Sequence, residues 1–331
     1  MSRINFIFKK MFMISQKNNK YNKFKSIFLG IFLSVLILAP FFAFSSHRSD
    51  FYVNTKASGE KNGSKDHPFE TINDALDKAD GKKANIHVAK GEYKENITLE
   101  KGIKLFGENK DNTIIKAKKD KWATVFIEND AEINGFTIKN GKRGIWVDDN
   151  AESKIVDCII KDNNEEGIYI EAGEVSESNQ VIISNTKVKE NDYKGIRAVG
   201  ARKVVITDNE IYGNKNDGID LASGTKGWIA ENSIRENGGS GMKLVLDGSE
   251  IWTRRNDIRE NKREGIETAS YGGAGRINID KSKIVKNGLY GIARLQRAGY
   301  IDWGKNLTFG GIMPELWGNI SGTLSNVIYI K

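Results

Sequence analysis

Four charged residues occupy one repeated position of the sequence, each two residues after a glycine that is followed by Ile or Met. If these glycines mark equivalent points of a repeating fold, the four side chains share one surface and can converge on a ligand. In such a group, an arginine can neutralise the carboxylate of a uronate sugar, and a lysine can then remove the proton from the neighbouring ring carbon, as in a polysaccharide lyase. Two acids can instead act as the acid and base of inverting glycoside hydrolysis. The candidate catalytic residues are Lys243 as base, Arg197 as carboxylate clamp, Asp220 and Glu267.

Aromatic residues at the same repeated position indicate sugar binding. Trp146 and Tyr169 each stand two residues after such a glycine, and flat aromatic faces pack well on the C–H surfaces of sugars. A second pair, Trp228 and Trp252, aligns in another strand of the repeat and is an alternative binding surface unless a neighbouring loop covers it. We therefore predict all four as substrate-binding residues.

Two acidic residues, Asp148 and Glu171, stand four positions after successive glycines of this set. Like charges on neighbouring strands repel each other unless a cation or a raised pKa compensates. A bound Ca²⁺ would compensate, so the pair is a candidate metal site. The alternative is that both side chains turn into water. The sequence indicates no other cofactor.

The side chains above must be positioned by a repeat of about 23 residues, because the glycines are 23, 28, 23, 23, 24 and 26 residues apart. Each repeat holds short Ile- and Val-rich strands and lacks the amphipathic stretches of a helical solenoid. A coil of this length that turns between strands and stacks on the next is a parallel β-helix. An asparagine four residues before each glycine then forms an internal hydrogen-bonded ladder, with the glycine supplying backbone freedom beside it. The glycines are Gly144, Gly167, Gly195, Gly218, Gly241, Gly265 and Gly291, and the asparagines are Asn140, Asn163, Asn191, Asn214, Asn237, Asn261 and Asn287.

The segments before the repeats carry a resemblance to a known superfamily. They resemble the N-terminal cap and opening coils of right-handed parallel β-helix proteins of the pectate lyase-like superfamily, and the segments are 51–55, 62–72, 86–93, 103–107 and 113–115. The resemblance covers about Phe51 to Asp302. It implies an all-β, right-handed parallel β-helix of about ten coils over residues 51–308, with a short capping helix within Phe69–Ala79 that covers the open sheet edge. Residues 309–331 are Gly-rich and irregular, and we expect them to form a C-terminal cap.

The catalytic signatures of this superfamily match the sequence poorly. Residues 216–220, Asn-Asp-Gly-Ile-Asp, are similar to an element of galacturonases, but residues 239–241 have Gly-Ser-Gly in place of that family's paired aspartates. The three histidines, His47, His67 and His87, precede the glycine repeats, which argues against a histidine-dependent lyase or epimerase. The superfamily also contains adhesins and other non-catalytic proteins, so the resemblance implies a fold more than an activity.

The N-terminus reads as an export signal. Seven basic residues and no acid precede the apolar run at 27–44, which ends in the small-residue pattern Ala43-Phe44-Ser45. Residues 1–45 are therefore predicted to be a signal peptide, or an N-terminal membrane anchor if uncleaved, because 18 apolar residues just suffice to span a bilayer. Without those seven residues, the chain has 44 basic and 43 acidic residues and a net charge of +1. The overall net charge of +8 therefore does not indicate nucleic-acid binding.

These features predict an exported protein, secreted, periplasmic or at the cell surface, whose partner is a polysaccharide. Three functions remain open. The first is binding or processing of a polysaccharide, with uronan lyase as the specific activity. The second is a non-catalytic adhesin or scaffold, in which the charged column is an ion-pair ladder. The third is an inverting glycoside hydrolase that uses Asp220 and Glu267, two rungs or about 9.6 Å apart. Contact with the membrane is expected only through an uncleaved N-terminal segment.

Overall fold

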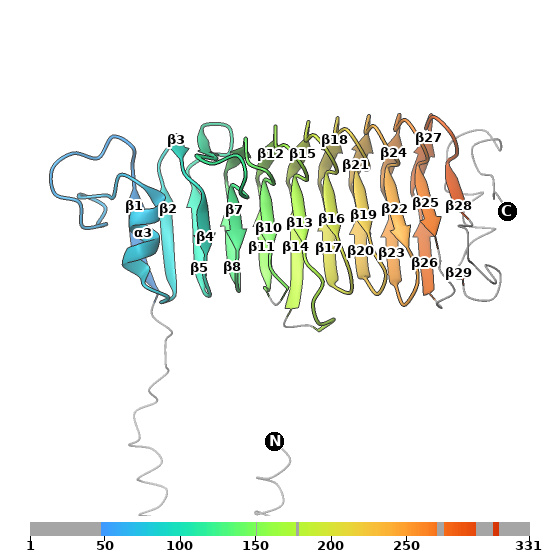
Figure 1. Cartoon of the computed structure of the whole chain (residues 1–331), viewed down its shortest axis with the longest axis horizontal. Helices are drawn as coiled ribbons and strands as arrows, with labels where there is room; N and C mark the ends of the chain where they lie inside the picture. The colour runs from blue at the N-terminus through green and yellow to red at the C-terminus, as the bar shows by residue number, and fades with distance from the viewer. Residues whose placement is uncertain (1–47, 150, 177–178, 270–274, 296–306, 311–331) are drawn as a thin grey trace, which may run out of the picture. The chain divides into compact units, whose positions relative to one another are not determined.

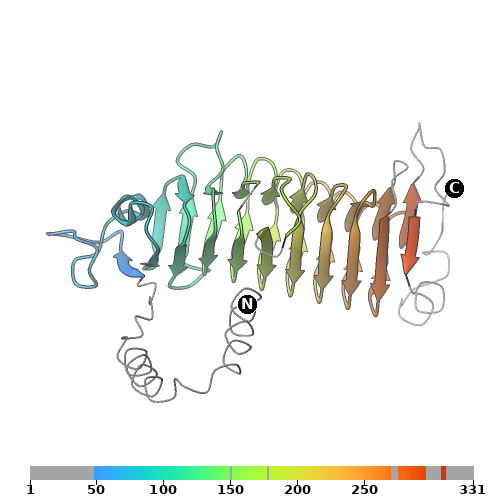
Figure 2. The ribbon, with the colours of Figure 1, turned by 90° about the horizontal axis from the view of Figure 1, so that it is seen from below.

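The computed structural model describes residues 48–149, 151–176, 179–269, 275–295 and 307–310, and these residues form a right-handed parallel β-helix. Each coil contributes one strand to each of three parallel sheets, and successive coils lie side by side along the helix (Figure 1). The same stacking is visible from below (Figure 2). The predicted leader, residues 1–45, lies outside the described residues. No helix among the described residues is long and apolar enough to cross a membrane.

We call the sheets A, B and C in the order in which each coil meets them. Sheet A contains β1 (Ser49–Val53), β2 (Ala84–Val88), β5 (Ile103–Gly107), β8 (Ala131–Asn134), β11 (Ser153–Val156), β14 (Gln180–Ser184), β17 (Lys203–Thr207), β20 (Lys226–Ala230), β23 (Glu250–Arg254), β26 (Gly275–Asp280) and β29 (Leu307–Gly310). Sheet B contains β3 (Gly91–Lys94), β6 (Thr113–Lys116), β9 (Thr137–Lys139), β12 (Ile159–Lys161), β15 (Lys187–Lys189), β18 (Glu210–Tyr212), β21 (Ser233–Arg235), β24 (Asp257–Arg259) and β27 (Lys283–Val285). Sheet C contains β4 (Ile97–Leu99), β7 (Val125–Ile127), β10 (Ile145–Val147), β13 (Ile168–Ile170), β16 (Ile196–Ala198), β19 (Ile219–Leu221), β22 (Met242–Val245), β25 (Ile266–Ala269) and β28 (Ile292–Leu295).

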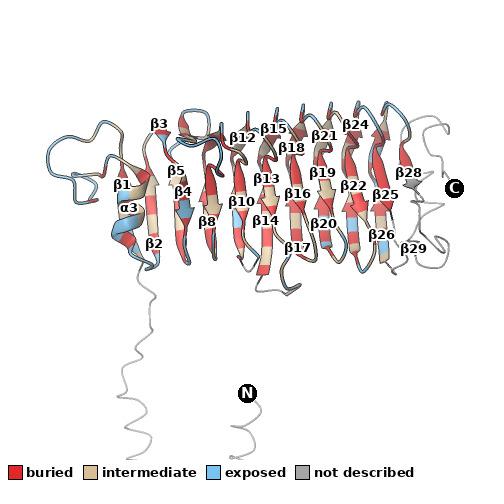
Figure 3. Cartoon of the chain, in the orientation of Figure 1, coloured by how far each residue is buried: buried red, intermediate tan, exposed pale blue. Residues whose placement is uncertain are grey.

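The core is built by strand alternation. In β19, Ile219 and Leu221 face inward and are almost fully buried, whereas Asp220 between them faces outward. The same pattern in the other coils stacks Ile, Val and Leu side chains into continuous columns, and Figure 3 shows buried and partly exposed residues alternating along the strands. Since β-branched side chains pack well on a pleated surface, the Ile-rich repeat suits this interior.

One short helix, α3 (Ile72–Ala79), lies at the N-terminal edge of the coils, as the sequence predicted. Its buried face, which includes Ile72 and Ala75, packs against the first strands. Thr71 caps the helix by accepting a hydrogen bond from Asp74 N at 3.1 Å, and Glu95 of the first coil accepts from the N–H groups of Ile72 and Asn73, each at 2.9 Å. These contacts satisfy helix donors that would otherwise remain unpaired. Of the predicted C-terminal cap, residues 311–331 lie outside the described residues, and 309–310 belong to β29.

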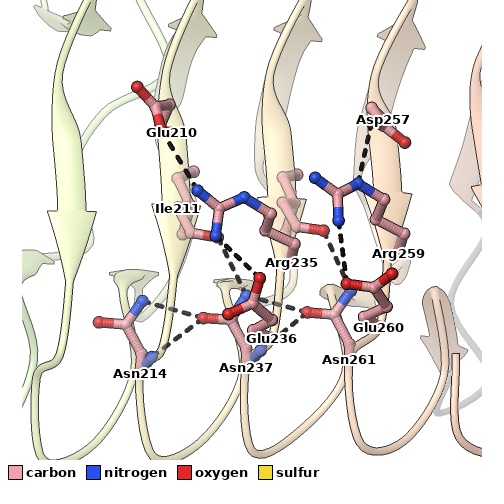
Figure 4. Close-up of polar contacts among 11 residues, drawn as sticks. Glu210, Ile211, Asn214, Arg235, Glu236, Asn237, Asp257, Arg259, Glu260 and Asn261 are labelled. Carbon is pink, nitrogen blue, oxygen red and sulfur yellow. Dashed lines mark hydrogen bonds and ion pairs between the residues drawn. The ribbon is translucent and has the colours of Figure 1, made fainter.

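The predicted asparagine ladder is present at the turn between sheets B and C. Each Nδ2 donates to Oδ1 of the next asparagine at 2.9–3.0 Å (Figure 4), along the series Asn163, Asn191, Asn214, Asn237, Asn261 and Asn287. The neighbouring glycines permit close packing of the coils, since a Cβ on Gly218 would lie 2.7 Å from Gly241 O. None of these glycines has the left-handed backbone conformation. The expectation that these glycines supply unusual backbone freedom was therefore wrong.

Asn140 does not belong to this ladder, contrary to the prediction. Five residues join β9 to β10, whereas six join β12 to β13, so counting four back from Gly144 reaches a different point of the turn. Asn140 is exposed with φ of 65°, and Gly141 takes the ladder position and donates its N–H to Asn163 Oδ1 at 3.1 Å.

A second ladder, which the sequence analysis missed, lines the turn between sheets A and B. Asn209 Nδ2 donates to Asn232 Oδ1 at 3.0 Å, and Asn232 Nδ2 donates to Asn256 Oδ1 at 2.9 Å. Hydroxyls extend the ladder, because the N–H of Cys158 donates to Thr186 Oγ1 and that of Asn256 to Ser282 Oγ, each at 3.3 Å. Two internal ladders therefore hold consecutive coils in register.

Candidate functional site

The outer face of sheet C carries the predicted column of aromatic and charged residues. Strand register confirms that the positions two residues after the glycines stack directly on one another, and the column extends to both ends of the sheet. In order, it contains Thr98, Phe126, Trp146, Tyr169, Arg197, Asp220, Lys243, Glu267 and Ala293.

A second column, which the sequence analysis did not consider, lies beside the first. It consists of the residues immediately before the glycines, and the pairing between coils extends to them: Gly195 N donates to Asp217 O and Gly218 N to Ser240 O, each at 3.0 Å. Applying the glycine count one residue backwards would have found these positions. They are Arg143, Glu166, Lys194, Asp217, Ser240, Glu264 and Tyr290. Together the two columns form what we call the sheet C network.

Glu166 joins the aromatic and charged parts of this network. Its carboxylate is 1% exposed and lies between two guanidinium groups: Arg143 Nε at 2.9 Å and Arg197 Nη1 at 3.0 Å. Such charge-assisted bonds are stronger than neutral ones. Arg197, the predicted clamp for a uronate carboxylate, is thus already engaged by a carboxylate of the protein, and its Nε lies 3.7 Å from Asp220.

Asp217 and Asp220 form the centre of the network. They flank Gly218, and the buried ammonium of Lys194 contacts both carboxylates, at 3.5 Å for Asp217. Burial raises the pKa of Asp217. The N–H of Ser240 and the charge of Lys194 partly oppose this shift, and nearby Asp220 adds to it, so the net pKa is raised. Burial acts to lower the pKa of Lys194, but Asp220 and Asp217 outweigh it, so this pKa is raised. Lys194 therefore remains a cation, while Asp217 holds its proton more tightly than an ordinary aspartate.

A second pair of carboxylates lies two rungs away. Glu264 and Glu267 flank Gly265, and Ser240 Oγ lies 2.9 Å from the first and 3.0 Å from the second. A hydroxyl has one hydrogen, so Ser240 can donate to only one of them at a time. Lys243 Nζ lies 3.5 Å from Glu267 and Arg263 covers both acids, so Glu267 is only 2% exposed although its strand position faces outward. The sequence analysis did not anticipate this burial, because Arg263 comes from the turn and not from the column.

The aromatic part of the column is continuous with these charges. Phe126, Trp146 and Tyr169 pack edge to face, with ring centres 5.5 and 5.9 Å apart. The guanidinium of Arg143 lies 3.8 Å from the centre of the Tyr169 ring, so this ring is partly covered. Trp146 is half-buried and lines an open pocket.

The other predicted aromatic pair lies on a different sheet. Trp228 and Trp252 are paired neighbours on the outer face of sheet A and are 42% and 41% exposed. No described loop covers them, although the guanidinium of Arg276 lies 5.7 Å from the Trp252 ring centre. The structure therefore divides the four predicted sugar-binding residues between two faces.

Asp148 and Glu171 follow β10 and β13 at the edge of sheet C, one rung apart, as expected. The sequence did not reveal the fully buried Arg202 nearby. Burial lowers the pKa of Arg202, and the charges of Asp149 and Asp148 act against that shift. Arg202 thus supplies a positive charge close to Asp148 without any metal. Among the described residues, no group of three or more His, Cys, Asp or Glu could hold a metal ion.

Comparison with protein families identifies the fold class. The family model described as "Right handed beta helix region" matches residues 101–181 and 174–306, more than half of the chain. The chain therefore belongs to this family of right-handed β-helix proteins. A second model, described as "Protein of unknown function (DUF1565)", matches residues 55–114. A comparison with curated proteins found no match.

Several solved structures are similar to this chain. The enzymatically active domain of tailspike protein 2 from bacteriophage CBA120 has a TM-score of 0.52 and 15% identity over 74% of this chain, which spans only 41% of the tailspike chain. Pectate lyase Pel9A has a TM-score of 0.45 and 14% identity, covering 86% of this chain and 80% of its own. Pectin methylesterase PemA from Erwinia chrysanthemi has a TM-score of 0.45 and 13% identity, covering 86% and 94%. At these identities the likeness to the tailspike domain shows the fold alone.

Proposed function

We propose that the outer face of sheet C binds an extended polysaccharide and hydrolyses its glycosidic bonds at Asp217 and Asp220. The observation that carries this proposal is the pair of carboxylates that contact one buried ammonium, with the pKa of Asp217 raised by burial. Glycoside hydrolysis needs one carboxyl group that retains its proton and one carboxylate that stays ionised. Asp217 protonates the leaving oxygen, and Asp220, which pairs with Lys194 and Arg197, is the second carboxyl group, which assists the replacement of the leaving group by water at the anomeric carbon.

The continuity of aromatic and charged residues supports a polysaccharide as the ligand. Trp146 and Tyr169 offer ring surfaces to sugar C–H groups, and the charged residues continue the same column without a break. The similar structures include a pectate lyase and a pectin methylesterase, whose names refer to a polysaccharide, and a tailspike domain described as enzymatically active. Trp228 and Trp252 on sheet A form a second candidate surface for the same polymer.

Uronan lyase activity is a second candidate, in which Lys243 is the base and Arg197 neutralises the uronate. The observation in its favour is the accessibility of Lys243, whose side chain is 24% exposed, compared with 8% for Lys194. Against it, both cations are paired with carboxylates of the protein, Lys243 with Glu267 and Arg197 with Glu166. An inverting hydrolase that uses Asp220 with Glu267 is disfavoured for another reason, because Glu267 is only 2% exposed and lies under Arg263.

The test is a panel of acidic and neutral polysaccharides, with reducing ends and unsaturated products measured in each reaction. We expect reducing ends without unsaturated product. Asp217→Asn should lower the rate at least about 100-fold, because general acid catalysis contributes on this scale. The matched control is Asp162→Asn in the turn after β12, where the carboxylate lies outside the sheet C network and pairs with Lys161 at 3.2 Å. Unsaturated product would favour the lyase, and no product from any polymer would favour the non-catalytic adhesin or scaffold.

Calcium at Asp148 and Glu171 remains a separate proposal. If these two residues hold Ca²⁺ for the reaction, EDTA should inhibit the wild type, and Asp148→Asn should remove that sensitivity. Arg202 is an alternative source of positive charge close to Asp148, so an unchanged rate of the wild type in EDTA would overturn the calcium proposal. We also propose that the protein acts outside the cytoplasm, which rests on the basic and apolar pattern of residues 1–45.

A further inference from the structure

An open pocket lies at the N-terminal end of the sheet C column, apart from the carboxylates. It has a volume of about 410 Å³, and its walls include Thr98, Phe126 and Trp146 from three successive rungs. The side chain of Trp122 forms another wall. Trp122 is 63% exposed, more than any other exposed large hydrophobic residue in the described part of the chain.

An enlarged turn places Trp122 beside this face. Eight residues, 117–124, join β6 to β7, whereas six residues join the corresponding strands in the coils from β12 onwards. Six residues are enough to connect sheet B to sheet C, so the two extra residues are not required to close the coil. They enlarge the turn that carries Trp122 next to Phe126.

The enlarged turn is held rigidly by one side chain. Asn96 Oδ1 accepts hydrogen bonds from the N–H groups of Lys118 and Lys119 at 3.1 and 2.8 Å. Asn96 Nδ2 donates to the carbonyl oxygens of Lys119 and Ala123 at 3.1 and 2.8 Å. The next coil adds a further bond, from Lys142 N to Trp122 O at 2.9 Å. A wall that is ordered in advance does not lose conformational freedom when a ligand binds.

The composition of the walls fits a sugar. Trp122, Phe126 and Trp146 provide aromatic surface for C–H groups, and the hydroxyl of Thr98 lies among them for a sugar hydroxyl. A purely apolar ligand would leave the Thr98 hydroxyl without water or a partner.

The distance from the pocket to the carboxylates suits several sugar units. Trp146 lies three rungs from Asp220 and Phe126 four, which corresponds to roughly 14 and 19 Å at the spacing of β-strands. A pyranose ring in an extended chain repeats on a length similar to one rung. A polymer that reaches both places must therefore be about four or five sugars long.

We propose that the pocket bounded by Trp122, Phe126 and Trp146 is a remote subsite for one sugar of the polysaccharide that reacts at Asp217 and Asp220. The proposal rests on the proposed function for the position of the reaction. Binding energy at a site far from the reacting bond raises the rate for long substrates and cannot act on short ones. The pocket thus makes chain length the property by which the protein selects its substrate, with Asn96 as a positioning residue.

The experiment uses a series of two to eight sugars prepared from the polymer that is degraded fastest. For the wild type, we expect kcat/KM to rise with length until the oligosaccharide fills the pocket. Trp122→Ala should remove about fivefold of the activity on the long substrates and none on the short ones, and Trp122→Phe should restore part of it. Asn96→Ala should show the same dependence on length. The control is Tyr212→Ala, an aromatic residue on the outer face of sheet B. An unchanged length dependence in Trp122→Ala would overturn the subsite.

Binding separates failure of the subsite from failure of the proposed function. If the wild type cleaves none of the polymers, a series of two to eight sugars is prepared from the polymer that binds most tightly, and the affinities are measured by calorimetry. A loss of about fivefold in Trp122→Ala that is confined to long oligosaccharides supports the subsite even without hydrolysis. Equal affinities of Trp122→Ala and wild type for every length overturn it.

Discussion

Asn214 donates its side-chain N–H to Asn237 Oδ1 at 3.0 Å, and Asn237 makes the equivalent bond to Asn261. The same Asn214 amide donates to Val188 O and accepts from the side chain of Asn191, so it joins three coils. This buried amide is fully used, which makes the ladder the most direct link between the repeat in the sequence and the stability of the fold.

Asn214→Leu should lower the free energy of unfolding by roughly 1–3 kcal/mol, because it leaves buried backbone and amide groups unpaired. Asn62→Leu is the control, since Asn62 is exposed and its side chain bonds only within its own loop, to Ser64 N and Glu60. The measurement is chemical denaturation of both variants. Equal destabilisation by the two substitutions would contradict the structural role of the ladder.

Asp217 should give the protein a characteristic dependence on pH. Its folded-state pKa is raised above the unfolded value, so its contribution to stability is complete below the ordinary range near 3.8 and is lost as pH rises through the folded pKa. The stability of the wild type relative to Asp217→Asn should therefore fall as pH increases from about 3 to 7. Denaturation of both proteins across this range tests the sign. A difference that is constant or increases with pH would refute the raised pKa.

Trp146→Ala should weaken polysaccharide binding by about 1 kcal/mol, or roughly fivefold in Kd, without unfolding the protein. Tyr169→Ala should have a smaller effect, because Arg143 already covers that ring. Calorimetry with the full-length polymer measures both. If Trp252→Ala abolishes binding while Trp146→Ala leaves it intact, the polymer binds sheet A and our choice of face is wrong.

Lys243→Ala separates the two catalytic hypotheses. In the hydrolase, Lys243 only offsets the charge of Glu267, so we expect reducing-end release to fall by less than about tenfold. In the lyase, the same substitution removes the base and abolishes unsaturated product. Lys187→Ala on sheet B, whose lysine pairs with Glu210 at 3.0 Å, is the control. Complete loss of reducing ends in Lys243→Ala would contradict the role that we give to Asp217.

The mature protein should begin near Ser46 when it is produced with its leader, because a signal peptidase cleaves after small residues. N-terminal sequencing of the protein outside the cytoplasm tests this. An intact Met1 on membrane-bound protein would indicate a retained anchor, and an intact Met1 on a soluble cytoplasmic protein would end the export hypothesis.

The sequence alone was sufficient to predict the fold and the residues of one candidate column on sheet C. Strand alternation has a period of two and the coil repeats at nearly constant length, so counting from Gly195 and Gly218 places Arg197 and Asp220 side by side, as the structure shows. Inward-facing Ile residues follow from the same count. Strand alternation is visible within a single repeat, and the repeat length is obtained by comparing successive repeats, so both can be counted in the sequence.

The turns and the environment of the charges were decided by tertiary structure. Asn140 is not part of the ladder because its turn is one residue shorter. The direction of the Asp217 side chain depends on the next coil, where the N–H of Ser240 donates to its carboxylate. Burial of Glu267 depends on Arg263, which reaches over it from outside the strand. The spacing of residues in a strand is a local property that sequence displays. The pKa of Asp217 and the coverage of Glu267 depend on charges and atoms that neighbouring coils contribute, and these come together only when the coils stack.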